Sequence, residues 1–315
     1  MTKRDRKILY IAGYGRSGST LLERILGSHE KLFGAGELWR LPGMLSKCDW
    51  TCSCGEEVDE CEFWGEIFTE LTKLDVAPEE WQKIQERKES LIHFLDHLRR
   101  GLSDGNRKSY EELTRSLFEE IFCQLPRSVS YLIDSSKTSR KSFFRPITLS
   151  RIAGLDVKVI HLIRDGRGCM WSNLKGSNRK MEKGEDPHLA FAALRTAISW
   201  PLTNSGADLF KKLEGSENYL RLTYESFVNR PKESLELIGG FVELDFTRQI
   251  DMLEKGKPIP STHQLAGNRL RKKKSIVLRE DDEWKQKLNR WHNFLFWLLD
   301  WPWALKYGYG PFGSS

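Results

Sequence analysis

A glycine-rich stretch near the N-terminus, GYGRSGST at residues 13–20, could hold an anionic group. Its glycines at positions 13 and 18 have the separation found in the triphosphate-binding loop G-x-x-x-x-G-K-[ST], and Thr20 has the hydroxyl position of that loop. Ser19, however, stands in place of the lysine. Because that lysine reaches the β- and γ-phosphates, its absence predicts a nucleotide with a shorter chain of anionic groups.

The loop itself supplies the expected contacts to the anion. Successive backbone N–H groups can point inward, and the positive end of a following helix adds to the attraction. Arg16 adds a fixed charge with fork geometry. We expect the 5′ end of the nucleotide to be bound by Gly15, Arg16, Ser17, Gly18, Ser19 and Thr20.

A second anion site is predicted after the apolar run VKVIHLI at residues 157–163. Arg164 follows that run directly, and Ser172 lies in the next predicted helix, so the two side chains can grip one phosphate from two sides. The alternative is a structural turn in which Asp165 pairs with Arg164 or Arg167. Two separate anion sites indicate a nucleotide that is phosphorylated at two places.

Four short, β-rich apolar runs alternate with helical patterns, which predicts an α/β fold. We expect a P-loop-like three-layer fold, with a central parallel sheet flanked by helices and ligands bound beyond the carboxyl ends of the strands. Asp134 is the only weak candidate there for a magnesium-binding carboxylate. The predicted strands cover residues 7–13, 129–134, 157–163 and 218–223.

We expect residues 1–315 to form a single domain with a mainly helical, cysteine-containing excursion at about 46–128. Amphipathic helices are predicted there at 79–101 and 110–125. The cysteines have the spacing C-x-x-x-C-x-C-x6-C, which could bind zinc, form disulfides or stay free, and we predict no metal from it. They are Cys48, Cys52, Cys54 and Cys61.

Both anion-binding motifs, GYGRSGSTLL and LIRDGRGCMWS, resemble the sulfotransferase superfamily, most closely its carbohydrate and tyrosylprotein branch. The resemblance implies that the donor is 3′-phosphoadenosine-5′-phosphosulfate (PAPS), with its 5′-phosphosulfate at the first loop and its 3′-phosphate at the second. LTYESFVNRP is similar to a family segment that places Tyr224 near the nucleotide. The segment HQLAGNRLRKKKSIVLREDDEW and the terminal KYGYG are also similar to family segments.

The resemblance also implies catalytic roles. Glu37, in a Gly-Glu segment, is expected to be the general base, with pairing to Arg40 as the structural alternative and His29 and His263 as rival bases. Lys137, just past a predicted strand, is expected to stabilise charge on the bridging oxygen, and Arg16 to share that work. No metal is required for this chemistry, and a carbohydrate hydroxyl is the first choice of acceptor.

The bulk composition limits the remaining choices. The 39% of hydrophobic residues fits a folded protein, and the net charge of +6 fits an anionic small-molecule ligand as well as a nucleic acid or a membrane surface. The basic run at 269–274 is expected to be a solvated face, so no nucleic acid is predicted. The segment at 294–305 is interrupted by Asp300 and Pro302, which favours a buried closing helix over a membrane span.

A cytoplasmic location is expected, because the apolar run after the charged N-terminus is too short for a signal peptide. The oligomeric state is not predicted. Two other functions compete with the sulfotransferase interpretation: a P-loop kinase of small molecules, and a non-catalytic module that binds acidic glycans or nucleic acid.

Overall fold

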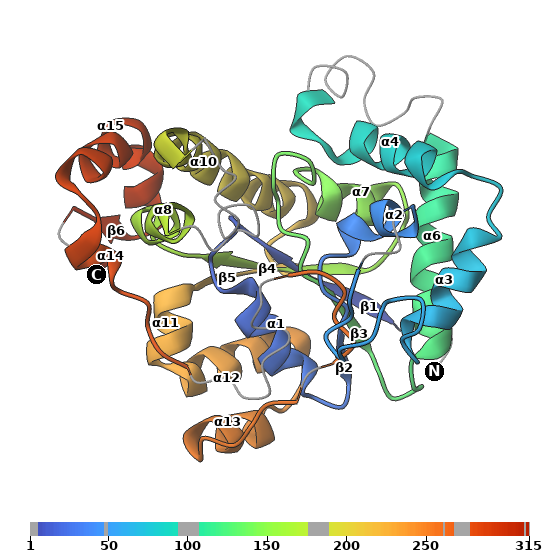
Figure 1. Cartoon of the computed structure of the whole chain (residues 1–315). Coiled ribbons are helices and arrows are strands. Elements are labelled where there is room, and N and C mark those ends of the chain that lie inside the picture. The colour runs from blue at the N-terminus through green and yellow to red at the C-terminus, as the bar shows by residue number, and fades with distance from the viewer. Residues whose placement is uncertain are drawn as a thin grey trace.

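The structure, a computed structural model, describes residues 6–46, 50–93, 107–175, 189–260, 262–267, 278–311 and 313–314. Its centre is a sheet of five parallel strands in the order β2-β3-β1-β4-β5 (Figure 1). The strands are β1 (Lys7–Ala12), β2 (Leu32–Gly34), β3 (Tyr131–Asp134), β4 (Val157–Ile163) and β5 (Tyr219–Thr223). The expected α/β architecture with a central parallel sheet is therefore confirmed.

Successive side chains of β1 point to opposite faces of the sheet, and both sets are apolar. Each face is therefore covered by helices that bury it. Leu9 and Ile11 point into a core shared with α1 (Ser19–Gly27), α11 (Tyr224–Asn229), α12 (Pro231–Val242) and α13 (Thr247–Glu254). Ile8, Tyr10 and Ala12 point to the opposite face. On that side lie α7 (Arg145–Arg151), α8 (Gly166–Leu174) and α10 (Leu189–Glu214) (Figure 1).

The excursion between β2 and β3 is mainly helical, as expected. It contains η2 (Leu38–Arg40), α2 (Leu41–Leu45), α3 (Trp64–Thr72), α4 (Pro78–Glu89), η3 (Leu91–His93) and α6 (Arg107–Gln124). The predicted helix over 79–101 ends at Glu89, where Ser90 takes an extended conformation with ψ 140°; residues 94–106 lie outside the described part. The apolar stripe predicted for residues 110–125 is buried, at Tyr110, Leu113, Leu117 and Ile121 of α6 and at Leu125 directly after it.

The C-terminal region forms α14 (Trp284–Lys287), α15 (Arg290–Lys306) and a two-stranded antiparallel pair, β6 (Tyr309–Gly310) with β7 (Gly313–Ser314). The expectation of a buried closing helix is wrong for most of α15. Only Phe296, Asp300 and Ala304 are buried, whereas Trp301 is 55% exposed. The helix has apolar side chains on all its sides, but only one side packs against α10 and the rest of the fold.

None of the helices in the described part of the chain has both the length and the apolar character needed to cross a membrane.

Candidate functional site

The carboxyl ends of all five strands lead to residues with candidate roles, and parallel pairing brings these ends to one edge of the sheet. β1 leads to the loop at residues 13–18, which lies between the loops after β3 and β4 because β3 and β4 pair on either side of β1. The order along the edge is Glu37 after β2, Lys137 after β3, the glycine loop, Arg164 after β4 and Tyr224 after β5.

Two positions of the glycine loop require glycine. Gly13 has φ 121°, and a Cβ there would lie 2.3 Å from the carbonyl oxygen of Leu162 on β4. Gly18 has φ 88°, and a Cβ there would lie 2.7 Å from the ring of Tyr224. Helix α1 begins at Ser19 and has no acidic residue in its first turn, so no carboxylate of that turn offsets the positive end of the helix dipole at the loop.

The two predicted anion sites meet at Arg16. Its Nε donates to Ser172 Oγ over 3.1 Å, and Arg164 Nη1 donates to the carbonyl oxygen of Arg16 over 3.1 Å. Burial lowers the pKa of Arg16, and the nearby charge of Arg164 lowers it further. Arg16 also has φ 74°, a left-handed conformation that is uncommon away from glycine. The structure thus brings together the residues of both loops.

Arg164 is held in place from several sides. Its guanidinium lies 4.5 Å from the centre of the Tyr224 ring and 3.2 Å from the Asp281 carboxylate. Tyr224 in turn accepts a hydrogen bond from the backbone N–H of Asp281 at 3.3 Å. Tyr224 therefore packs between the glycine loop and Arg164, and its expected contact with the nucleotide stays a prediction.

Asp165 pairs with Arg167 at 2.7 Å and caps the first turn of α8 by accepting from the Arg167 backbone N–H. The structural turn considered as the alternative, in which Asp165 pairs with an arginine, is therefore formed with Arg167. Arg164 instead contacts Asp281 and Tyr224. The terminal KYGYG segment contributes Tyr309, which donates to Glu225 over 2.8 Å, and Glu225 accepts from the backbone N–H of Asp165.

Glu37 and Lys137 form a salt bridge of 2.5 Å, with side chains that are 15% and 13% exposed. Burial raises the pKa of Glu37, but the charges of Lys137 and Arg40 outweigh that effect and lower it to about 2. The expected pairing of Glu37 with Arg40 is also present, at 2.6 Å. Lys137 has φ 66°, so two candidate catalytic residues, Arg16 and Lys137, have left-handed backbones.

Sequence reasoning missed Glu23, a carboxylate buried in α1. It accepts from the backbone N–H of Gly36 at 2.5 Å and from the hydroxyl of Ser135 at 2.6 Å. Burial raises its pKa to about 7. Glu23 thus connects the segments that carry Glu37 and Lys137. A glutamate inside the apolar pattern LLERIL was the available signal.

Asp134 does not face an open site. Its carboxylate pairs with Arg145 at 2.9 Å, and Arg145 also pairs with Glu89 at 2.6 Å, all three side chains being buried. Tyr110 donates to the same Glu89 oxygen at 2.8 Å. This network joins β3 to the excursion, so the weak magnesium-ligand interpretation of Asp134 is replaced by a structural one.

The two rival histidines contact groups other than Glu37 and Lys137. His29 contacts the carbonyl oxygen of Asp245 and accepts from the backbone N–H of Lys31. His263 lies among cysteine side chains of the excursion. The basic run at 269–274 and Cys48 fall outside the described residues.

An apolar groove of about 320 Å³ lies beside the loop that carries Lys137. Arg140 and Phe143 of that loop line it, together with α10. The connection to the site is direct, because Thr138 donates to the carbonyl oxygen of Thr203 in the groove and accepts from the backbone N–H of Gly13. Its apolar side chains include Leu91, Phe191, Leu194, Ile198 and Leu202.

A parallel sheet with a glycine loop after its central strand and an arginine after the neighbouring strand β4 is suited to an anionic ligand bound beyond the carboxyl ends of its strands. The profile described as "Sulfotransferase family" matches residues 9–248. The chain therefore belongs to the sulfotransferase family, and the protein is a PAPS-dependent sulfotransferase. Neither the match nor the fold confirms the carbohydrate branch. No functionally curated protein is significantly similar in sequence to the chain.

Solved structures share the fold. The sulfotransferase domain from the curacin biosynthetic pathway is 21% identical, with a TM-score of 0.53, and the alignment covers 98% of this chain and 99% of that one. Mouse sulfotransferase SULT7A1, solved in complex with PAP, is 13% identical (TM-score 0.51; coverage 96% and 84%). Sulfotransferase STF9 from Mycobacterium avium is 11% identical (TM-score 0.51; coverage 98% and 79%).

Proposed function

We propose that this sulfotransferase binds PAPS across the carboxyl edge of its sheet and transfers the sulfuryl group to an acceptor hydroxyl beside Glu37. One observation carries the proposal: five neighbouring strands deliver Glu37, Lys137, the glycine loop, Arg164 and Tyr224 to the same edge, in that order. Each residue comes from a different strand end, so the sheet itself sets their relative positions.

The donor is held at its two anionic ends in this proposal. The 5′-phosphosulfate lies on Gly15, Arg16, Ser17, Gly18, Ser19 and Thr20, and the 3′-phosphate between Arg164 and Ser172. Two observations support it: Arg164 donates to the backbone carbonyl oxygen of Arg16, and the charge of Arg164 acts on the Arg16 guanidinium, so the two cations are near enough to attract an anion together. Tyr224 positions Arg164 through the contact of its ring with the guanidinium.

The proposed reaction is an in-line displacement. The acceptor oxygen forms a bond to sulfur while the bond between sulfur and the bridging phosphate oxygen breaks, and the acceptor proton moves to Glu37. The departing oxygen gains negative charge, which the Lys137 ammonium and the Arg16 guanidinium stabilise. These cations do the work that magnesium does in kinases, so the proposed reaction needs no metal at the reacting centre.

The salt bridge between Glu37 and Lys137 couples donor binding to activation of the base. A carboxylate with a pKa of about 2 is a weak base, and it is weak because Lys137 and Arg40 stabilise its charge. When Lys137 turns to the oxygens of the donor, Glu37 loses one of these cations and its pKa rises. The base is then strongest when the sulfuryl group is present.

The apolar groove guides the choice of acceptor. The resemblance to the carbohydrate branch suggests a sugar hydroxyl, whereas the aliphatic and aromatic lining of the groove suits a hydroxyl on an apolar body. Arg140 and Arg195 at the same groove suit an acceptor that also carries a negative charge. We therefore propose both a sugar and an apolar alcohol as acceptor classes, the latter on the strength of the groove.

A transfer screen tests the function. The protein is incubated with radiolabelled PAPS and with sugars, phenols, lipid alcohols and hydroxyl-bearing peptides, and the labelled product is quantified against released adenosine 3′,5′-bisphosphate. The proposal expects one product molecule for each bisphosphate released. Absence of both donor binding and transfer would contradict it. Transfer to apolar alcohols alone would discard the sugar acceptor, and the reverse result would discard the role of the groove.

The same preparation tests the other two classes of function. A kinase would bind ATP with magnesium and transfer phosphate, which disagrees with the missing lysine and with the pairing of Asp134 to Arg145. A non-catalytic module would bind glycans or nucleic acid with steep salt dependence and without need of the glycine loop. We also propose that the enzyme consists of a single domain, that it is located in the cytoplasm and that it does not bind nucleic acid.

A further inference from the structure

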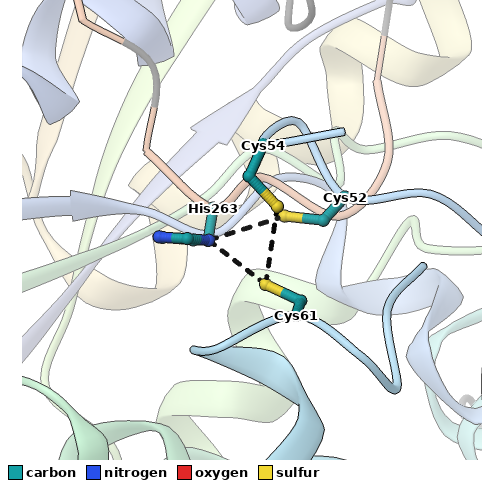
Figure 2. A group of neighbouring side chains, drawn as sticks. All are labelled: Cys52, Cys54, Cys61 and His263. Carbon is teal, nitrogen blue, oxygen red and sulfur yellow. Dashed lines mark hydrogen bonds between the residues drawn. The ribbon is translucent and has the colours of Figure 1, made fainter. Parts of the chain in front are cut away.

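Three cysteine side chains and one histidine converge away from the proposed donor site. Cys52, Cys54 and Cys61 belong to the excursion, and His263 belongs to the segment that follows α13 (Figure 2). Cys61 and His263 are 202 residues apart in the chain. The four atoms that could bind a metal, three Sγ atoms and Nδ1 of His263, all lie within 4.8 Å of one another.

The spacing of these atoms is that of a tetrahedral zinc site. Zn–S bonds of about 2.3 Å and Zn–N bonds of about 2.0–2.1 Å place two sulfur ligands about 3.8 Å apart, and a sulfur and a nitrogen about 3.6 Å apart. Here the Sγ atoms of Cys54 and Cys61 are 3.7 Å apart. His263 Nδ1 lies 3.8 Å from Cys52 Sγ and 3.2 Å from Cys61 Sγ.

The backbone around the cluster is fixed by hydrogen bonds between the two segments. The Ser53 N–H donates to the carbonyl oxygen of Gln264 at 3.1 Å, and the Gln264 N–H donates to Ser53 Oγ at 2.8 Å. Ser53 Oγ also donates to the carbonyl oxygen of Thr262. Ser53 stands between two of the cysteines, and Thr262 and Gln264 flank His263, so these bonds hold the ligands in place.

The surroundings of His263 also fit a metal ligand. Its Nδ1 points to the sulfur atoms, while Nε2 lies 3.4 Å from a carboxylate oxygen of Glu62. A histidine that binds a metal through one nitrogen commonly donates its other N–H to a carboxylate, which fixes the tautomer. The ring of Phe63 stacks on His263 with 5.7 Å between centres and covers one side of the imidazole.

We propose that Cys52, Cys54, Cys61 and His263 bind one structural zinc ion. Four protein ligands close a tetrahedral site and leave no open position for water or substrate, which is typical of structural and not of catalytic zinc. The soft thiolate donors favour zinc over magnesium or calcium. This revises the expectation of no metal, and it does not depend on the proposed acceptor or mechanism.

A disulfide is the main chemical alternative. A bond between Cys54 and Cys61 would bring their sulfur atoms to about 2.05 Å, and it would leave Cys52 and His263 beside it without a metal to share. The described cysteines are free thiols in the structure. Three thiols and an imidazole whose ligand atoms all lie within 4.8 Å of one another fit one shared ion better than one bond between two of the thiols.

The position of the ion gives it a consequence for the site. Leu265, two residues after His263, donates to the carbonyl oxygen of Ala35, and a Cβ on Gly36 would lie 2.8 Å from the Ala266 carbonyl oxygen. Glu37 follows directly. Zinc at His263 would therefore fasten the excursion to the segment that packs against the Glu37 backbone.

Metal analysis of the purified full chain tests the inference. The protein is prepared without chelators, and bound metals are quantified by plasma mass spectrometry. About one zinc ion per chain is expected. Cys61→Ser and His263→Ala should lower the zinc content at least tenfold. Cys123→Ser is the matched control, because Cys123 is an exposed cysteine of α6 outside the cluster, and it should retain the zinc.

Cobalt binding to the wild-type chain tests the inference even if a cysteine variant fails to fold. Cobalt added to the reduced, zinc-free wild-type chain should give the intense thiolate-to-metal absorption and the visible bands of a tetrahedral site. An octahedral cobalt spectrum, absence of zinc and cobalt binding by the reduced chain, or a Cys54–Cys61 disulfide in the freshly purified protein would each overturn the inference. Equal zinc content in Cys61→Ser and wild type would do the same.

Discussion

Glu37 and Lys137 lie 100 residues apart in the chain and form a salt bridge of 2.5 Å at the edge of the sheet. They meet because β2 and β3, which precede them, are neighbours in the sheet. The pair places an anion that could accept a proton beside a cation that could stabilise a leaving group.

Removal of the Glu37 charge should stop the reaction and spare donor binding. Glu37→Gln is expected to lower kcat by about 10²–10⁴-fold, the range for loss of a general base. Its affinity for adenosine 3′,5′-bisphosphate, measured by calorimetry, should stay within a few-fold of wild type because Lys137 remains. Glu30→Gln, an exposed glutamate nearby in sequence, is the control. Full activity in Glu37→Gln would end its assignment as the base.

The coupling of Glu37 to Lys137 predicts a shift in pH dependence. With a pKa of about 2, Glu37 is ionised in the free enzyme at every ordinary pH, so kcat/KM for the donor should show no acidic limb from it. Lys137→Ala removes one cation that lowers this pKa. The residual activity of that variant should therefore fall at a higher pH than wild type as the solution is acidified. Identical acidic limbs would contradict the coupling.

Arg164 should report on the 3′ end of the donor. Arg164→Ala is expected to weaken binding of adenosine 3′,5′-bisphosphate by about 10–100-fold, as for the loss of a hydrogen bond to a charged group. Binding of a donor that lacks the 3′-phosphate should change much less. Arg151→Ala, which removes an exposed arginine of α7, serves as the control. An unchanged preference between the two nucleotides would show that the 3′-phosphate binds elsewhere.

Asp300 should make stability fall as the pH rises. Burial raises its pKa from 3.8 to about 8, and neither oxygen has a hydrogen-bond partner among the described residues. Between these two values the folded state holds a proton that the unfolded state has lost, so the free energy of unfolding decreases with pH.

Urea unfolding of Asp300→Asn at pH 5 and pH 8.5 tests this sign. The variant should gain about 1–3 kcal/mol relative to wild type between the two pH values, because its amide does not ionise. Asp75→Asn, an exposed position, should show no such gain. A variant that loses stability relative to wild type as the pH rises would contradict the argument.

The sequence predicted the strands that carry strong apolar runs, and with them the parallel sheet. β2 was missed because three residues, Leu32–Gly34, are too few to show a period. α15 was expected to be buried because its composition is apolar, but composition does not tell how many sides of a helix find a partner.

Within the site, local motifs predicted the glycine loop, Arg164 and Tyr224. The strand order was not predicted, and the pairing of Glu37 with Lys137 depends on it. Glu23 was missed, and His263 was considered only as a base and not as a partner of the cysteines, for a similar reason. Glu23 acts on Gly36 and Ser135 of distant segments, and His263 joins cysteines more than 200 residues away. Neither relation has a signature within a single stretch of sequence.

A crystal structure of the protein soaked with adenosine 3′,5′-bisphosphate tests the central proposal most directly. We predict that its 5′-phosphate lies on the backbone N–H groups of residues 17–20 and that its 3′-phosphate contacts Arg164 and Ser172. A bisphosphate that binds with either phosphate elsewhere, or that leaves the glycine loop empty at saturating concentration, would contradict the account.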